Sequence, residues 1–235
     1  VDKVKNLIQS NPAQASEEAG ELLKGKNKKN VDLVTSVAHV YLDAGKITEA
    51  QEYLAMAKKA NNKDPKVSVL EGDIALAQKN IGQACQLYEQ AIYFDPNCKE
   101  AYLKYAQAYK SASPTQAIEK LEQLKAVDPN CLEADRELAE VYYSGNRFGK
   151  AAEMYAKFID TPLATEDDML KYAFALFLNH DFEKSLQVAQ KGLQKNARHA
   201  AFNRLVMYNN TDLKRYEDAE KAADAFFNAS DRADY

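Results

Sequence analysis

The feature that most constrains the fold of this 235-residue chain is a small residue that returns about every 34 positions. One series lies inside apolar stretches, with successive gaps of 34, 34, 33 and 34, and consists of Ala38, Gly72, Ala106, Ala139 and Ala173. A second series, which follows the first by 11 or 12 residues, consists of Ala50, Ala84, Ala117, Ala151, Ser185 and Ala219. Two series locked at one spacing indicate a tandem repeat with two structural elements in each unit.

Both elements of the repeat have the pattern of an amphipathic helix. Ala84, Leu87, Tyr88 and Ala91, for example, follow the i, i+3, i+4, i+7 spacing of one helical face. Between the two elements lie short helix-breaking segments, which are Gly45, Lys79-Asn80, Ser113-Pro114, Gly145-Asn146 and Asn179-His180-Asp181. The repeat is therefore predicted to be an antiparallel helical hairpin, in which the small residues let the two helices approach closely.

These residues resemble the tetratricopeptide repeat family, whose 34-residue motif has small, aromatic and turn-proline landmarks. In the second repeat the matching residues are Gly72, Ala84, Tyr88, Ala91 and Pro96. In the third they are Tyr102, Ala106, Tyr109, Ala117 and Pro129, and in the fourth Leu138, Ala139, Tyr142, Phe148, Ala151 and Tyr155. The resemblance implies an all-α fold, a right-handed superhelical solenoid of antiparallel helix-turn-helix repeats, most similar to bacterial members of the family.

The repeat positions also predict how the chain is divided. A degenerate helical hairpin is expected at 1–30, followed by repeats at 31–64, 65–98, 99–131, 132–165 and 166–199, a divergent sixth repeat at 200–233, and the start of a further repeat at 234–235. The last repeat of a solenoid needs a polar cap because no neighbour covers its apolar face. No such cap is evident, so we expect the chain to be a fragment of a longer repeat protein.

Motifs of catalysis and of metal binding are missing from the sequence. It contains no GxGxxG, phosphate-binding P-loop, HExxH or GxSxG pattern. The three histidines are far apart, and the three cysteines include no CxxC pair, which argues against a zinc cluster or a disulfide framework. We therefore expect a protein that is not an enzyme and that has no catalytic, cofactor-binding or metal-binding residues.

The charge distribution restricts the classes of partner. The formal net charge is -4, with Lys and Glu mixed along the chain, which disfavours nucleic acid. The densest basic run, Lys24, Lys26, Lys28 and Lys29, is interpreted as a solvated loop. No stretch approaches the roughly 20 apolar residues that a membrane-spanning helix needs, so we expect no membrane insertion by this fragment. The sequence does not distinguish the cytoplasm from the periplasm or cell envelope.

The resemblance implies a binding groove on the concave side, lined by the first helix of each hairpin. Aromatic and apolar residues gather toward the C-terminal end of this groove, with two arginines nearby: Arg136, Tyr143, Leu170, Phe174, Phe177, Leu178, Arg204 and Tyr208. Aromatic and Arg side chains supply much of the binding energy of protein interfaces. The alternative interpretation is that these aromatic residues pack between neighbouring repeats.

The expected function is that of a non-catalytic protein–protein interaction scaffold, which binds a peptide or protein segment in its groove. Two alternatives stay open, a small-molecule or glycan-binding solenoid and a substrate-positioning repeat region of a larger enzyme. Acidic chaperone tails are disfavoured as ligands, because the family's lysine and asparagine clamp is missing. Asp73 and Glu140 lie at positions where the clamp would have lysine or asparagine, and their carboxylates would repel an acidic tail.

Overall fold

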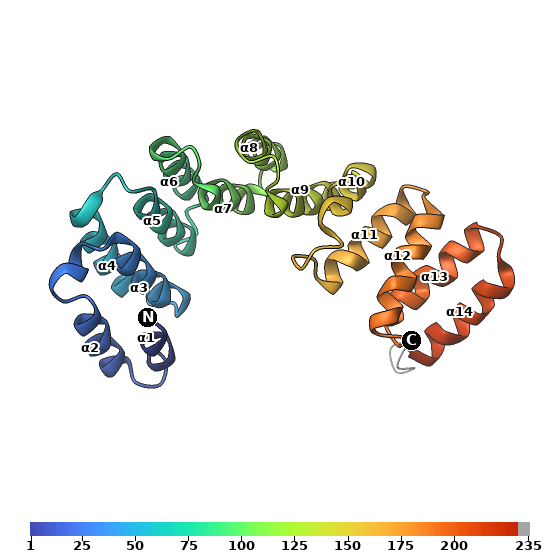
Figure 1. Cartoon of the computed structure of the whole chain (residues 1–235), viewed down its shortest axis with the longest axis horizontal. Coiled ribbons are helices and arrows are strands. Elements are labelled where there is room, and N and C mark those ends of the chain that lie inside the picture. The colour runs from blue at the N-terminus through green and yellow to red at the C-terminus, as the bar shows by residue number, and fades with distance from the viewer. Residues whose placement is uncertain (230–235) are drawn as a thin grey trace. The chain divides into compact units, whose positions relative to one another are not determined.

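The computed structural model describes residues 1–229, and this part of the chain is entirely helical (Figure 1). It contains 14 α-helices and one 3-10 helix, with no strand among the described residues. The all-α fold predicted from the repeat pattern is thus confirmed. The expected start of a further repeat at 234–235 lies outside the described residues. The helices form two compact units, Val1–Pro129 and Asn130–Tyr235.

The first unit is a stack of helical hairpins. Its elements are α1 (Asp2–Leu7), α2 (Pro12–Leu22), the 3-10 helix η1 (Gly25–Lys29), α3 (Val31–Asp43), α4 (Ile47–Asn61), α5 (Pro65–Ala77), α6 (Ile81–Phe94), α7 (Lys99–Tyr109) and α8 (Pro114–Val127). Helices pair in chain order, α1 with α2 through to α7 with α8. The first helices of successive hairpins also touch, since α3 packs on both α1 and α5.

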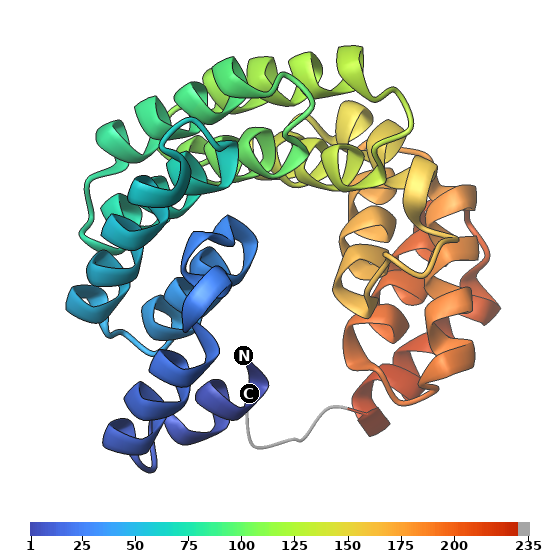
Figure 2. The ribbon, with the colours of Figure 1, turned by 60° about the vertical axis from the view of Figure 1, so that its left-hand side comes forward.

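The second unit repeats this arrangement. Its helices are α9 (Leu132–Ser144), α10 (Phe148–Phe158), α11 (Glu166–Leu178), α12 (Phe182–Lys195), α13 (Ala200–Asp212) and α14 (Tyr216–Ala229). The hairpin partners α9 and α10, α11 and α12, and α13 and α14 lie side by side (Figure 2). The first helices α11 and α13 are also in contact. They share a core with α12 and α14 that includes Met169, Phe202 and Leu205.

The small residues of the repeat mark the places where helices cross most closely. A Cβ atom added to Gly72 would lie only 2.5 Å from Cε1 of Tyr88, the large aromatic residue of the partner helix. Between successive hairpins, Gly192 of α12 lies equally close to Phe202 of α13, whose Cε2 atom would be 2.6 Å from an added Cβ. The aromatic rings therefore occupy the volume that a side chain at these glycines would take.

The turn inside each hairpin has a recurring backbone conformation. Five of the six hairpins from α3 to α14 have a residue with positive φ two positions before the second helix begins, namely Gly45 (74°), Lys79 (65°), Asn146 (57°), His180 (61°) and Lys214 (60°). In the α5–α6 turn, Lys79 N–H donates to Leu76 O at 2.8 Å and Asn80 N–H donates to Ala75 O at 2.9 Å. This is the hydrogen-bond pair of a Schellman motif, which closes the C-terminus of a helix.

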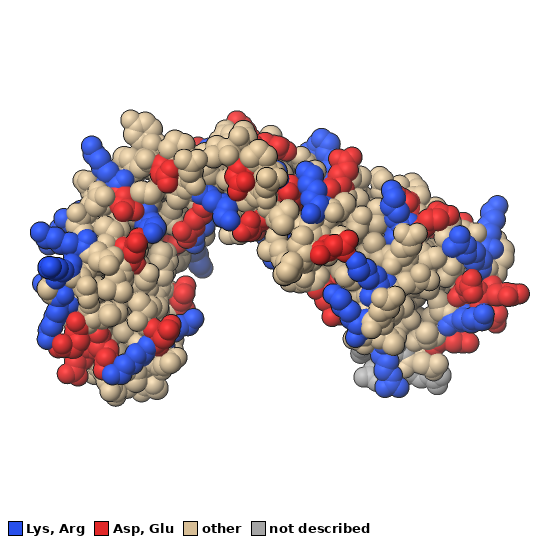
Figure 3. Space-filling view, viewed as in Figure 1, with Lys and Arg blue, Asp and Glu red and all other residues tan. Residues whose placement is uncertain are grey.

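The basic run near the N-terminus is more ordered than the sequence indicated. The prediction of a loop was wrong for Gly25–Lys29, which form η1 and pack against α3 and α4. Asn27 Nδ2 donates to Leu22 O at 2.7 Å and so ties η1 to the end of α2. The lysines themselves are exposed, as predicted, and basic side chains gather over this region at the left of Figure 3.

Replacing Gly72 with Ala tests the close helix crossing. The new Cβ would overlap the Tyr88 ring, which is fully buried, so Gly72→Ala should lower the free energy of unfolding by about 1–3 kcal/mol. Gly20→Ala is the matched control, because no heavy atom lies within 4 Å of its added Cβ. It should be neutral or stabilising by up to about 1 kcal/mol in urea unfolding. Equal effects of the two changes would contradict the crossing geometry.

Lys79→Gly tests the turn. A non-glycine residue with positive φ is strained, so this change should stabilise the first unit by up to about 1 kcal/mol. Lys110 is an exposed lysine at a helix end with an ordinary φ of -54°. Lys110→Gly should therefore destabilise by a similar amount in the same urea unfolding experiment. Destabilisation by both changes would show that φ at Lys79 is not costly.

Candidate functional site

The eight residues predicted to line a groove all lie on first helices of the second unit. Arg136 and Tyr143 are on α9, Arg204 and Tyr208 are on α13, and the remaining four, Leu170, Phe174, Phe177 and Leu178, are on α11. Because α11 and α13 pack together, six of the eight come from two neighbouring helices. We call Phe174, Phe177, Leu178, Arg204 and Tyr208 the α11–α13 patch.

Some aromatic residues of the patch also belong to the core. Phe177 lies with its ring centroid 6.0 Å from that of Tyr208 and 5.5 Å from that of Phe182. Phe174 and Phe177 are half-buried and pack against the core of the unit. Leu178 and Tyr208 are 44% and 40% exposed. Tyr208 thus rests on Phe177, which joins α11 to α12 and α13, while Leu178 is the exposed last residue of α11.

The two arginines have different surroundings. Arg136 forms a two-pronged ion pair with Asp168, with Nε–Oδ1 at 3.1 Å and Nη2–Oδ2 at 3.0 Å. Asp168 is buried and also accepts from Thr165 N–H at 2.8 Å, which closes the N-terminus of α11. The guanidinium of Arg204 instead lies 5.9 Å from the ring centroid of Phe174 and forms no ion pair with any described residue. Arg204 is thus the cation of the patch that remains available to a ligand.

A polar cluster in the first unit was not anticipated from the sequence. The buried carboxylate of Asp73, on α5, accepts from the hydroxyl of Tyr88 at 2.8 Å and pairs with Lys104 Nζ at 2.9 Å. It also faces His39 Nε2 at 2.9 Å, while Nδ1 of the same ring faces Thr35 O at 2.9 Å. Both ring nitrogens thus face oxygen acceptors, an arrangement that the doubly protonated imidazolium satisfies.

The same construction returns 67 residues later in the second unit. Glu140 Oε1 accepts from the hydroxyl of Tyr155 at 2.9 Å and from Lys171 Nζ at 2.9 Å. In both units a carboxylate on one first helix therefore binds a tyrosine of its own hairpin and a lysine of the next. The carboxylates that were expected to repel an acidic ligand are paired with lysines, so that repulsion is weaker than the sequence indicated.

The clusters shift the acidity of their members. Burial alone would raise the pKa of Asp73, but the hydrogen bonds and charges of His39, Lys104 and Tyr88 hold it below its ordinary value. The hydrogen bond to Asp73 raises the pKa of His39 above its ordinary value of 6.5. Burial, followed by the Glu140 charge, raises the pKa of Tyr155 well above the usual range. These groups therefore form hydrogen bonds and ion pairs that join one helix to another.

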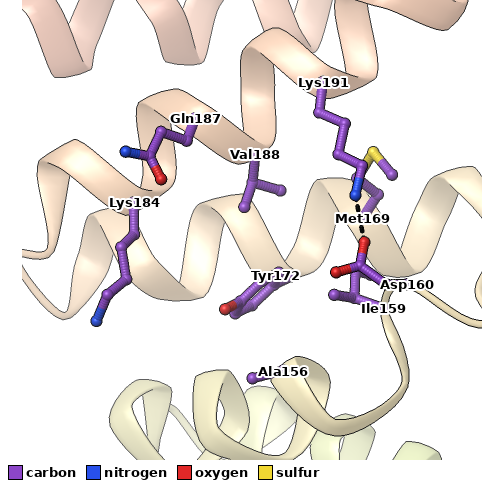
Figure 4. A pocket seen from close by; sticks show the side chains of 9 residues that line it. All are labelled: Ala156, Ile159, Asp160, Met169, Tyr172, Lys184, Gln187, Val188 and Lys191. Atoms are coloured by element: carbon purple, nitrogen blue, oxygen red, sulfur yellow. Dashed lines mark hydrogen bonds and ion pairs between the residues drawn. The ribbon is translucent and has the colours of Figure 1, made fainter.

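A separate hollow of about 270 Å³ lies between α10, α11 and α12 (Figure 4). Its walls are Ala156, Ile159, Asp160, Met169, Tyr172, Lys184, Gln187, Val188 and Lys191. Tyr172 points into the centre, and Lys191 pairs with Asp160 at one side. Burial raises the pKa of the Tyr172 phenol, so it is a hydrogen-bond donor at neutral pH.

Residues 1–229 include no group of three or more His, Cys, Asp or Glu side chains placed to hold a metal ion. The three cysteines are free thiols, and burial raises the pKa of Cys85 to about 11, which disfavours the reactive thiolate. Within the same residues, no helix has both the length and the apolar character to cross a bilayer.

The His39–Asp73 pair predicts a pH-dependent stability of the first unit. Since the pKa of His39 is raised, its contribution is fully present below pH 6.5 and is lost as pH rises through the folded value. Asp73, whose pKa is lowered, contributes above pH 3.8 and loses its contribution only under stronger acid. His39→Asn should therefore lower the thermal midpoint most at about pH 5 and progressively less toward about pH 9.

The control for this experiment is the same His39→Asn change in an Asp73→Asn background. Without the carboxylate, the effect of replacing His39 should no longer shrink as pH rises, because the partner that raises its pKa is gone. An effect of His39→Asn that is constant with pH in the otherwise unchanged chain would contradict the ion pair.

Comparison with known proteins identifies the repeat. A family model described as tetratricopeptide repeat matches residues 38–98 and 107–164, which together are just over half of the chain. No protein among the curated sequences compared matches the chain.

Solved structures with the same fold include several bacterial proteins. PilF of Pseudomonas aeruginosa has a TM-score of 0.66 and 15% identity, over 84% of this chain and 90% of PilF. MamA has a TM-score of 0.62 and 17% identity, over 70% and 91% of the two chains. A tetratricopeptide repeat protein from Parabacteroides merdae has a TM-score of 0.59 and 13% identity, over 99% and 92%. Hairpin geometry, small-residue spacing and the family match together show that this chain belongs to the tetratricopeptide repeat family.

Proposed function

We propose that this protein is a non-catalytic scaffold that binds a peptide or protein segment along the first helices of its second unit, at the α11–α13 patch. Tetratricopeptide repeats form protein-interaction scaffolds, and the patch gives this scaffold a specific contact region. The observation that carries the proposal is the exposed Tyr208 ring against the half-buried Phe177, with the exposed Leu178 next to Phe177 in the sequence.

The composition of the patch supports a protein ligand. Tyr208 and Leu178 can bury apolar surface against a partner, and each fully buried side chain of this size is worth about 1.5–3 kcal/mol. The guanidinium of Arg204 adds N–H donors, and it forms no ion pair with a carboxylate of the described residues. Because Phe177 is fixed against Phe182 and Tyr208, the contact surface is largely preformed, which reduces the entropy lost on binding.

The alternative of glycan binding has less support. Sugars stack on flat, exposed aromatic faces, and the sequence has no Trp. In the patch itself only Tyr208 is an exposed aromatic residue, since Phe174 and Phe177 are half-buried. The non-catalytic part of the proposal is supported by the polar clusters, whose carboxylates at Asp73 and Glu140 are engaged by tyrosine and lysine side chains of their own unit.

The test uses peptides selected from a random displayed library on the purified chain. Binding of the selected peptides is then measured by fluorescence anisotropy with Leu178→Ser plus Tyr208→Ser. This double variant should weaken binding at least about tenfold, because both residues are exposed and apolar. Phe174 and Phe177 are left unchanged because they pack against the core, and their loss would confuse binding with stability.

The matched control is Tyr93→Ser, which removes an 82% exposed tyrosine from α6 in the other unit. It should leave peptide affinity within about twofold of the unchanged chain. The proposal would be contradicted if the selected peptides bound the Leu178/Tyr208 variant as well as they bind the Tyr93 variant.

A further inference from the structure

A basic hollow in the first unit has no part in the proposed binding at the α11–α13 patch. It lies between η1 and α4 and has a volume of about 350 Å³. Its walls are Lys28, Lys29, Glu52, Ala55, Met56, Lys59 and Ala60. Figure 3 shows basic side chains gathered at this edge of the unit, on the left of the view. We call it the η1–α4 hollow.

The lysines of this hollow are not neutralised by nearby carboxylates. Lys28, Lys29 and Lys59 form no ion pair with any described residue. By contrast, the neighbouring Lys24 pairs with Glu21, and Lys58 pairs with Glu71 at 2.6 Å. Three unpaired cations and the single carboxylate of Glu52 therefore surround one hollow, which gives it a net positive local charge.

The backbone that carries two of these lysines is held in place. Gly25 begins η1 with a φ of 59°, which glycine adopts without strain. Asn27 Nδ2 donates to Leu22 O at 2.7 Å, and the side chain of Asn30 accepts from Leu33 N–H at 3.2 Å, which caps α3. Lys28 and Lys29 thus project from a backbone fixed at both ends, and less entropy is lost when they bind a ligand than for lysines on a free loop.

The mixed lining of the hollow indicates the class of ligand. Met56, Ala55 and Ala60 give it an apolar part next to its three lysines. The formal net charge of -4 opposes binding of long polyanions. An acidic peptide fits both parts of the lining, because its carboxylates can pair with the lysines while a neighbouring apolar side chain contacts Met56.

From this complementarity we infer that the η1–α4 hollow binds an acidic segment of a partner protein, in which carboxylates flank an apolar side chain. The site is independent of the α11–α13 patch, since it belongs to the other unit. It also differs from a clamp on first helices, because its cations come from η1 and the last turn of the second helix α4.

The experiment uses the full chain and the fluorescein-labelled peptide Gly-Glu-Glu-Leu-Glu-Glu-Gly, with fluorescence anisotropy as the readout. A second peptide has Ser in place of Leu and the same charge. We expect the Leu peptide to bind more tightly, and its affinity to fall as salt is raised.

Lys28→Glu with Lys59→Glu should weaken binding of the Leu peptide about tenfold or more. Lys5→Glu with Lys110→Glu, the same charge change at exposed positions elsewhere in the unit, should change it less than about twofold.

Two further measurements separate the outcomes, one with a second pair of substitutions and one with lipid vesicles. Lys28→Gln with Lys59→Gln removes the cations without placing carboxylates at the end of α4, and it should also weaken binding if the reversed-charge variant fails to fold. Vesicles of phosphatidylserine and phosphatidylcholine are tested by sedimentation. The inference is overturned if the Leu and Ser peptides bind equally, if both charge-reversal variants lose affinity equally, or if only the vesicles bind.

Discussion

The fold depends on how closely the two helices of each hairpin can cross. Where the first helix has Gly72, the ring of Tyr88 fills the space above the glycine, and its hydroxyl reaches Asp73 at 2.8 Å. A larger residue would displace the ring and with it that hydrogen bond. Close crossing therefore determines both the packing inside a hairpin and the polar contact that leads to the next one.

The links between hairpins give the two units different surfaces. In the first unit, Asp73 joins three successive first helices through His39 and Lys104. In the second, Glu140 repeats the link to a lysine, but the position that follows one repeat later is Phe174. From there onward the first-helix surface is aromatic. The same scaffold thus presents charged, internally paired groups in the first unit and again around Glu140, and an aromatic surface with an arginine outside any ion pair at the α11–α13 patch.

The sequence predicted the hairpins and their turns well because both follow from local rules. Gly45 and the Lys79-Asn80 pair lie where the apolar helical pattern is interrupted, and the positive φ of Gly45 and Lys79 ends the first helix there. The fixed spacing of small residues indicates two packed helices in each repeat. Buried ion pairs were missed, since nothing in the local sequence of Asp168 shows that it faces Arg136 from 32 residues away. The clusters of carboxylate, tyrosine and lysine did leave a signal, because the spacing of these three residues in the sequence is the same in both units. That spacing becomes informative only once the register of the repeats is known.

The sequence pattern could not separate residues that contact a ligand from residues that pack in the core. Phe177 satisfies the pattern of a core residue and of a contact residue, and the structure shows that it packs inward while supporting Tyr208. Hydrogen exchange of the full chain, with and without a peptide selected on it, locates the bound segment. Binding at the α11–α13 patch should slow exchange in α11 and α13. Slowing confined to α10, α12 and α14, with α11 and α13 unchanged, would contradict it.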